Sequence, residues 1–325
     1  MQDVMERIQT TAGNRIGGRP DAVASDLAYL TIGFVNVCLF GRPGAPNGSW
    51  VLIDAGLPGS AARIKRAAHE WIGPWARPSA IVLTHGHFDH VGAVRTLAEQ
   101  WDVPVYAHPL EHPYLSGRSS YPPPDPTVGG GAMAALSRFY PRGPVNLGQR
   151  LRALPDDGSI PGMPGWRWVP TPGHTPGHVS FFRDADRTLI AGDAFVTTKQ
   201  ESAVAALTQR PEMHGPPAYF TPDWESARRS VEQLAALEPL RIITGHGPPM
   251  QGDRMLSALH DLARNFERLA VPAQGRYVGQ PALADETGVV AVPPPVPDPL
   301  PRIALALGVG LLLAAVLRKS SRPAG

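Results

Sequence analysis

Short apolar runs, separated by polar and turn-forming residues, mark the first part of the chain. Residues 27–40 are rich in β-branched and aromatic side chains, and residues 50–53 form an apolar run closed by Asp54. Residues 80–84 give a further apolar run, and residues 104–107 another. Runs of this length and composition are typical of β-strands, so we expect one strand in each segment.

Helical spacing fills the gaps between these strands. In residues 60–71, apolar side chains recur at Ala61, Ile64, Ala68 and Trp71, and residues 91–101 show a similar pattern. Such spacing predicts one buried face on a helix. Strands that alternate with helices indicate layers of sheet and helix.

The second half of the chain repeats this arrangement. Strands are expected at residues 166–169, 179–182, 187–191 and 241–244, with helices at residues 223–237 and 254–269. In each half, histidines come directly after an apolar strand. The pattern predicts an α+β protein, a four-layer αββα sandwich whose site lies where strand ends meet.

One long segment interrupts the regular pattern inside an expected catalytic domain of residues 1–290. Residues 113–165 are dominated by turn formers, among them prolines 122–124 and glycines 129–131, which cannot continue a helix or a central strand. Loops of this length in compact domains are often functional. We therefore interpret about 113–165 as an insertion that shapes the substrate site.

The C-terminal region has a different composition. A proline-rich linker at residues 291–302 precedes the tail of residues 303–319, in which residues 303–317 are uninterruptedly apolar between basic neighbours. As a helix this run would reach about 22 Å, short of a hydrocarbon core of roughly 30 Å. A membrane anchor and a short helix packed on protein both remain open. Because the N-terminus lacks a signal-like apolar region, the main domain is expected to be cytoplasmic, with the tail as its candidate membrane contact.

Charge and cysteine content narrow the classes of function. Thirty Lys and Arg against twenty-eight Asp and Glu leave a formal charge of +2, unlike the basic excess of nucleic-acid binders. No nucleic-acid partner is expected, and the substrate should be a small molecule. Cys38 is the single cysteine, which excludes an intramolecular disulfide and a thiolate zinc cluster.

The segment 84–90 (THGHFDH) carries the strongest chemical signal. It follows the strand at residues 80–84, and alternation would place His85, His87 and Asp89 on one side of an extended chain. Imidazole nitrogens and carboxylate oxygens suit zinc and similar cations. Because one segment cannot supply a whole catalytic site, further ligands are expected elsewhere.

Those ligands are expected at three other strand ends. In residues 171–178 (TPGHTPGH), Pro176 argues against a helix, so we expect only His174 to bind metal, with His178 hydrogen-bonded to a neighbouring residue of the site. Asp193 ends an apolar strand and could bridge two metals, and His246 ends another. Asp54 is in the same position, and we expect it to orient a ligand; capping of the following turn is the alternative. The other histidines are expected to be surface or structural: His69, His108, His112, His214 and His260.

Taken in order, these residues resemble the metallo-β-lactamase superfamily, whose pattern is a His-x-His-x-Asp-His run, a later His, a bridging Asp and a final His. The resemblance covers residues 54–246. It implies the αββα fold and two divalent metal ions, most simply Zn²⁺, with iron or manganese as alternatives. It also implies one ion bound by His85, His87 and His174, a second bound by Asp89, His90 and His246, and Asp193 shared between them.

The resemblance does not specify a substrate, because the superfamily includes thioesterases such as glyoxalase II, lactonases, phosphodiesterases, β-lactamases and sulfur dioxygenases. Zinc β-lactamases with a cysteine ligand are disfavoured, since Asp193 stands where their thiolate lies. Acyl-homoserine lactonases carry a tyrosine three residues past the bridging Asp, where this chain has Val196; Tyr219 is the candidate substitute in substrate binding. Residues 171–178 look like glyoxalase II, but its glutathione-binding residues find no match.

The function expected from the sequence is metal-dependent hydrolysis. A metal-bound hydroxide would attack an ester, thioester or lactone bond, with Asp89 as a ligand and proton acceptor. The alternatives are a phosphodiesterase, a mononuclear iron sulfur dioxygenase that uses two histidines and one aspartate of the same set, and a non-catalytic scaffold.

Overall fold

The structure is a computed structural model that describes residues 19–297. The expected tail at 303–319 lies outside the described residues, as does the part of the expected linker from residue 298 onward. Among residues 19–297, no helix combines the length and the apolar character needed to cross a bilayer.

Seven strands form the first sheet, in the order of the sequence. They are β1 (Asp21–Ala24), β2 (Leu27–Ile32), β3 (Val35–Phe40), β4 (Val51–Ile53), β5 (Ala80–Val82), β6 (Val105–Ala107) and β7 (Leu151–Ala153). The strands from β1 to β4 pair antiparallel, and those from β4 to β7 pair parallel. The carboxyl ends of β4 and β5 therefore meet at one edge.

The second sheet has five strands in the order β12-β11-β10-β9-β8. They are β8 (Trp166–Pro170), β9 (Val179–Arg183), β10 (Thr188–Gly192), β11 (Arg241–Thr244) and β12 (Met250–Gln251). Strands β10 and β11 are parallel, so their carboxyl ends also lie together. A separate hairpin of β13 (Leu283–Asp285) and β14 (Gly288–Ala291) follows near the end of the described chain.

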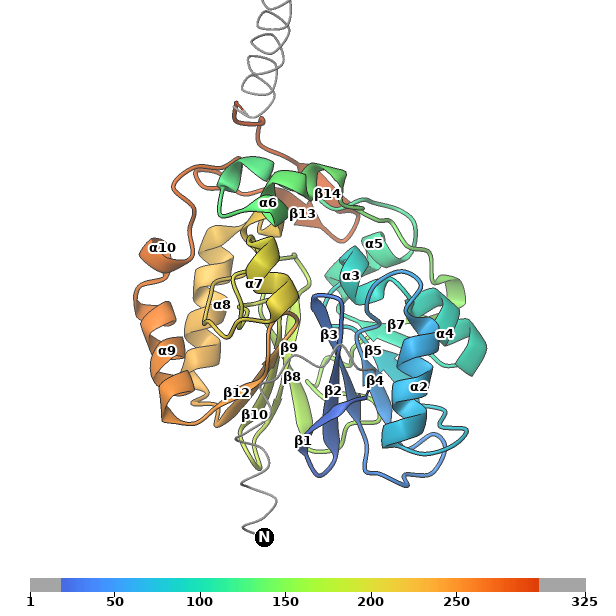
Figure 1. The fold of residues 1–325 in the computed structure, drawn as a ribbon. Helices are drawn as coiled ribbons and strands as arrows, with labels where there is room; N and C mark the ends of the chain where they lie inside the picture. Colours follow the sequence, from blue (N-terminus) through green and yellow to red (C-terminus); the bar gives the residue numbers. More distant parts are fainter. Residues whose placement is uncertain (1–18, 298–325) are drawn as a thin grey trace, which may run out of the picture.

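Helices cover the outer faces of the two sheets (Figure 1). α2 (Ala61–Trp71) and α4 (Val94–Trp101) cover the first sheet, while α8 (Trp224–Ala236) and α9 (Asp253–Arg264) cover the second. Three buried apolar clusters match the three interfaces: first sheet with helices, sheet with sheet, and second sheet with helices. The expected αββα sandwich is confirmed.

Alternation along β3 explains how one strand serves two cores. Val35, Val37 and Leu39 join the helix-facing cluster, whereas Cys38 and Phe40 join the cluster between the sheets. Successive side chains point to opposite faces of a sheet, so a fully apolar strand is buried on both sides.

Two predicted elements are divided in the structure. Residues 27–40, expected as one strand, form the hairpin β2–β3, because Gly33 takes a φ of 67° and turns the chain. The helix expected at residues 254–269 breaks at Asn265 into α9 and α10 (Phe266–Leu269). Both predictions had the right element type and the wrong continuity.

The segment 113–165 contains more regular structure than its turn formers suggest. β7 lies within it and extends the first sheet by pairing parallel with β6. Short helical pieces surround it: α5 (His112–Leu115), α6 (Ala132–Leu136), η2 (Pro126–Val128), η3 (Ser137–Phe139) and η4 (Gly148–Arg150). The insertion thus contains a strand of the first sheet and several short helical turns, and its role at the substrate site stays a prediction.

Candidate metal centre

The polar residues singled out in the sequence converge at the strand ends. His85 follows β5, and Asp193 and His246 follow the parallel strands β10 and β11. His174 lies in the loop between β8 and β9. The edges of two facing sheets thus bring together residues that are up to about 160 positions apart in the chain.

The segment 84–90 changes conformation in its middle. His87 has extended backbone angles and precedes the short helix α3 (Phe88–Val91), so Asp89 and His90 are helical. The prediction that Asp89 continues an extended run with His85 and His87 is wrong, as is the start of the following helix at residue 91. The turn into α3 directs Asp89 and His90 toward the second sheet, where they approach His246 and Asp193.

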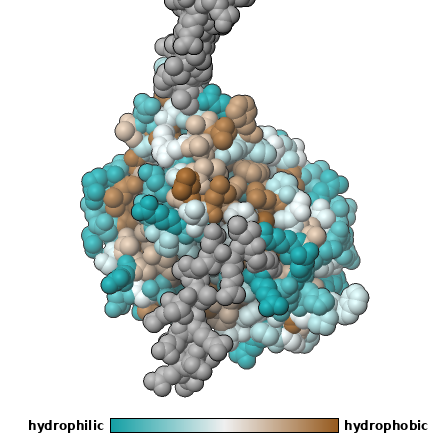
Figure 2. All heavy atoms as spheres, viewed as in Figure 1, coloured by the Kyte–Doolittle hydropathy of each residue, from teal (hydrophilic) through white to brown (hydrophobic). Residues whose placement is uncertain are grey.

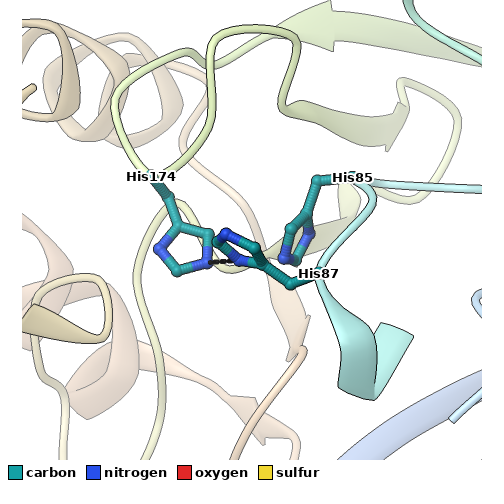
Figure 3. Close-up of side chains that lie close together, drawn as sticks. All are labelled: His85, His87 and His174. Atoms are coloured by element: carbon teal, nitrogen blue, oxygen red, sulfur yellow. Dashed lines mark hydrogen bonds between the residues drawn. The ribbon is translucent and has the colours of Figure 1, made fainter. Parts of the chain in front are cut away.

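The first group of candidate metal ligands contains His85, His87 and His174. Figure 3 shows the three rings facing one another, with His87 Nδ1 lying 2.9 Å from His174 Nε2. The ring of His85 lies 4.8 Å from that of His87 and 4.9 Å from that of His174, centroid to centroid. All three side chains are buried, so these nitrogens are shielded from water.

A second group contains Asp89, His90 and His246, and a third joins His85 and His90 to Asp193. Asp193 Oδ2 lies 3.0 Å from His246 Nε2, 3.4 Å from His174 Nε2 and 3.5 Å from His90 Nε2. One carboxylate oxygen is therefore close to nitrogens of both histidine groups.

The outward-facing nitrogens of these histidines have partners, which fixes the direction of the rings. His90 Nδ1 lies 2.8 Å from Asp54 Oδ2, His246 Nδ1 donates to the Phe34 carbonyl at 2.7 Å, and Thr84 Oγ1 lies 3.1 Å from His85 Nδ1. By contrast, the buried atoms His85 Nε2, His90 Nε2 and Asp193 Oδ1 lack a hydrogen-bond partner among the described residues. Buried polar atoms without partners are rare, and a cluster of nitrogen and oxygen donors of this kind fits divalent cations.

The charges of the centre depend on one another. Burial raises the pKa of Asp193, but the histidines His246 and His90 outweigh it and hold that pKa well below its usual range. Burial and the neighbouring His90 lower the pKa of His87 to about 3, so its imidazole is neutral and one of its two ring nitrogens carries no proton. A metal requires an ionised carboxylate and neutral imidazoles, which describes Asp193 and His87. At His90 and His246 burial is outweighed by the carboxylate of Asp193, which raises the pKa of both histidines.

Asp54 is outside the three ligand groups but binds residues of the segment that carries the histidines. Its Oδ1 accepts the Thr84 backbone N–H at 2.8 Å, and its Oδ2 accepts the Thr84 hydroxyl at 2.8 Å and lies beside His90. The backbone of Asp54 has a φ of 59°, an uncommon value for a residue with a side chain. The carboxylate contacts the segment that carries the histidines rather than capping the turn after β4.

His178 is absent from the three groups. Its Nε2 accepts the Asp193 backbone N–H at 2.9 Å, and its Nδ1 lies 2.8 Å from Thr171 Oγ1. Burial, as the largest cause, lowers the pKa of His178 to about 4. A neutral imidazole that accepts at Nε2 thus positions the loop on which Asp193 lies.

Tyr219 and Phe220 form an aromatic wall beside the centre, in η5 (Ala218–Phe220). The Phe220 ring stacks on His87 with centroids 4.5 Å apart, and Tyr219 packs against Tyr140 at 5.7 Å. Burial and the charge of Asp89 raise the pKa of Tyr219 well above its usual range. Tyr219 therefore lies close to the centre as a neutral phenol.

Glu111 is a buried residue that the sequence analysis missed. Its Oε2 accepts the Gly86 N–H and its Oε1 accepts the Gly177 N–H, both at 2.9 Å, and the Tyr121 hydroxyl donates to the same carboxylate. Glu111 thus ties the loop of His87 to the loop of His174. A lone acid in an irregular segment gives little signal, because exposed acids are common in such segments.

Asn36 is the second residue missed. From β3 its Nδ2 donates to the carbonyls of Thr244 at 2.9 Å and Gly247 at 2.6 Å, on either side of His246. Its backbone N–H donates to the Gly245 carbonyl at 2.7 Å. The available signal was a single amide inside a buried apolar strand, which requires hydrogen-bond partners.

A narrow recess opens beside His87 and His174. Its other walls are aromatic rings and prolines: Tyr121, Pro122, Pro123, Phe220, Pro222 and Tyr277. The Tyr277 hydroxyl donates to the Pro123 carbonyl at 2.6 Å, which ties the segment after α10 to the insertion. The five remaining histidines of the sequence stand apart from the three ligand groups: His69, His108, His112, His214 and His260.

Comparison with known proteins places this arrangement in a family. The model of the metallo-beta-lactamase superfamily matches residues 30–246. The probable metallo-hydrolase YflN of Bacillus subtilis (strain 168) is 48% identical over 240 residues, which cover 74% of this chain and 90% of that protein. A hydroxyacylglutathione hydrolase of Klebsiella pneumoniae is 32% identical over 147 residues, 45% of this chain and 43% of its own.

Solved structures agree at the level of the fold. A beta-lactamase domain protein from Burkholderia ambifaria aligns with a TM-score of 0.56 at 17% identity, covering 80% of each chain. A metallo-beta-lactamase family protein from Thermus thermophilus aligns with a TM-score of 0.53 at 21% identity, covering 76% of this chain and 81% of its own.

Proposed function

This chain belongs to the metallo-β-lactamase superfamily and is a metal-dependent hydrolase. From this premise we propose that its centre would hold two divalent cations and that it hydrolyses an ester, thioester or lactone bond. The observation that carries the proposal is the position of Asp193 Oδ2, within 3.0–3.5 Å of His246, His174 and His90 nitrogens. A carboxylate shared by two histidine groups is the arrangement expected of a binuclear site.

The proposed ligand sets follow these groups. His85, His87 and His174 would hold one cation, and Asp89, His90 and His246 would hold the other, with Asp193 shared. Nitrogen and carboxylate donors without a thiolate suit Zn²⁺, which we propose, and also accommodate iron or manganese.

Cations held by these residues would lower the pKa of water from about 15.7 toward 7 and would polarise the carbonyl of the substrate. The residues of the chain accept the proton and hold the ligands in position. Burial raises the pKa of Asp89, so its carboxylate is suited to accept a proton as the substrate is attacked. Asp54 and His178 hold His90 and the Asp193 loop in place.

We propose that the insertion, about residues 113–165 within a catalytic domain of residues 1–290, shapes the substrate site. Tyr121 and the prolines after it form one wall of the recess beside His87, and Phe220 forms another. These walls exclude water and pack against the apolar part of a small substrate. Tyr219, buried near Asp89, is the candidate hydroxyl for the oxygen of the scissile group.

A panel of thioester, lactone, β-lactam and phosphodiester substrates tests this function. The chain is assayed after reconstitution with Zn²⁺ and after treatment with a chelator, and oxygen uptake is recorded in parallel. Hydrolysis of the thioester or lactone that disappears with the chelator and returns with Zn²⁺ is expected. Hydrolysis by metal-free protein contradicts the proposal.

The group of His85, His90 and Asp193 supports a second candidate, because two histidines and one carboxylate can hold a single iron. In that case the chain would oxidise a sulfur compound. One iron per chain with oxygen uptake, and no hydrolysis in the panel, would favour this activity over the first.

A further inference from the structure

Among residues 19–297, the candidate metal centre is almost closed from solvent. Each of its seven candidate ligands has an exposed fraction of 6% or less. The recess beside His87 and His174 offers a free volume of about 10 Å³, which is roughly the space that one water molecule needs. The walls of this recess therefore decide which group of a substrate can lie beside the two histidines.

One of these walls comes from the chain after α10. We name residues 274–282 the covering segment. Three hydrogen bonds join it to the insertion and to the loop after η5: Gln274 Nε2 donates to the Thr127 carbonyl at 3.1 Å, the Arg276 N–H donates to the Asp125 carboxylate, and the Ala282 N–H donates to the Pro222 carbonyl at 3.0 Å. Because Asp125 is buried, its contact with Arg276 is also shielded from water. The covering segment is thus fixed at both of its ends.

The figures show the surroundings of this cover. In Figure 1 the chain runs from α10 to the end of the molecule that holds α6 and the hairpin β13–β14, with α7 (Ala203–Thr208) below them. Figure 2 shows hydrophobic residues gathered over the same end. The cover therefore lies in a part of the molecule with a largely apolar surface.

Tyr277 is the residue of the covering segment that lines the recess. Its side chain is 3% exposed, and its hydroxyl donates to the Pro123 carbonyl at 2.6 Å. The ring also belongs to the apolar cluster between the second sheet and its helices. Burial, as the largest cause, raises the pKa of Tyr277, so the phenol is neutral. Packing and the hydrogen bond together hold the ring in one place.

The chemistry of the recess favours an uncharged group. Apart from His87 and His174, its walls in the described chain are aromatic rings and prolines, with no Lys, Arg, Asp or Glu side chain among them. A charged group placed there would lose its hydration without gaining an ionic partner. The recess therefore suits a small apolar group.

We propose that Tyr277 determines the size of the substrate: its ring restricts the recess to a short, uncharged acyl group, such as acetyl or propanoyl, and excludes longer fatty acyl chains. This inference rests on the proposed function, because it places the acyl side of the scissile bond beside His87 and His174. One methylene in an apolar pocket changes kcat/KM by about 10- to 200-fold, so a fixed ring is enough to select by length. Tyr277 is thus a specificity-determining residue outside both the insertion and the ligand segments.

The test is a series of thioesters that share N-acetylcysteamine as the thiol and carry acyl chains from acetyl to octanoyl. We compare kcat/KM of the Zn²⁺-reconstituted chain with that of Tyr277→Ala. In the unmodified chain kcat/KM should fall as the acyl chain grows. Tyr277→Ala removes the ring, so the ratio of hexanoyl to acetyl hydrolysis should rise by at least about tenfold. An unchanged ratio would overturn the proposal.

Two further variants distinguish the ring from the rest of the covering segment. Gln274→Ala, at an exposed residue, removes the hydrogen bond to the Thr127 carbonyl but leaves the ring, so the ratio should stay unchanged. Tyr277→Leu keeps an apolar side chain of smaller size, and its ratio should rise even if Tyr277→Ala does not fold. An equal rise in Gln274→Ala would attribute the selectivity to a loosened segment and would contradict a role of the ring.

Binding measurements keep this inference distinct from the proposed function. If no thioester is hydrolysed, the proposed hydrolysis fails, but calorimetry with straight-chain carboxylates from acetate to octanoate still reports the size of the recess. The affinity for octanoate relative to acetate should rise by at least about tenfold in Tyr277→Ala and stay unchanged in Gln274→Ala. An unchanged ratio in Tyr277→Ala, or no binding of acetate by the unmodified chain, would overturn the inference.

Discussion

The two sheets contribute to the centre in different ways. The first sheet supplies four candidate ligands from the single segment 84–90 at the end of β5, whereas the second supplies three from the separate positions His174, Asp193 and His246. The first set is placed mainly by its own backbone, through one turn from extended chain into α3. The second set depends on contacts from elsewhere in the fold.

Those contacts can be identified residue by residue. His178 accepts the N–H of Asp193, Asn36 binds the carbonyls on both sides of His246, and Glu111 fixes the loop of His174. The contiguous set also has distant partners, because Asp54 binds Thr84 and His90 and Glu111 accepts the Gly86 N–H. Its spacing is nevertheless local, whereas the scattered set depends on distant contacts for both its spacing and its support. Substitutions in each set of ligands and in their supporting residues test this difference.

His87→Ala removes a candidate ligand of the contiguous set, and we expect the largest effect from it. Metal content and turnover should fall together, with turnover lower by at least about a thousandfold, because polarisation by the cation contributes several kcal/mol to catalysis. Elemental analysis and a hydrolysis assay measure both. His69→Ala, at an exposed histidine of α2, should match the unmodified chain. Full activity in His87→Ala would contradict the proposed metal site.

Glu111→Ala affects both sets, because Glu111 joins the loop of His87 to that of His174. The N–H groups of Gly86 and Gly177 would lose their partner, at about 1–3 kcal/mol each. We expect the free energy of unfolding to fall by about 2–5 kcal/mol and metal affinity by about 10–100-fold. Urea unfolding and metal titration measure these changes. Glu99→Ala, at an exposed acid of α4, should change neither; wild-type affinity in Glu111→Ala would show that the two loops need no common partner.

Asn36→Ala distinguishes the two proposed metal ions. It removes donors only from the carbonyls around His246, so the ion held by His85, His87 and His174 should stay while the other weakens by about tenfold or more. Titration with Zn²⁺ should give one unchanged and one weakened step. Asn47→Ala, in an exposed turn, is the control. Equal weakening of both steps would contradict the separation.

His178→Gln should have the smallest effect, visible as a pH dependence. The pKa of His178 is lowered from 6.5 to about 4 by burial, so between these values the unfolded chain binds a proton that the folded chain does not. Stability of the metal-free protein should therefore decline as pH falls from about 6.5 to about 4. Urea unfolding across this range should give a shallower decline in His178→Gln. An identical decline would mean that His178 titrates normally in the folded chain.

The same contrast explains what the sequence could predict. The segment 84–90 was recognisable because its spacing is fixed within seven residues, and Asp193 and His246 because each ends an apolar strand. Asn36 and Glu111 were missed since their partners lie up to 211 positions away in the chain. The bend at His87 was missed because short helices such as α3 form through tertiary contacts rather than periodicity.

Counting metal ions tests the central claim most directly. The chain is stripped with a chelator, titrated with Zn²⁺, and followed by elemental analysis and hydrolysis of the best substrate of the panel. We predict two ions per chain, with hydrolysis appearing as the centre fills. A single ion at saturation, or unimpaired hydrolysis by the stripped chain, would contradict a shared role for Asp193.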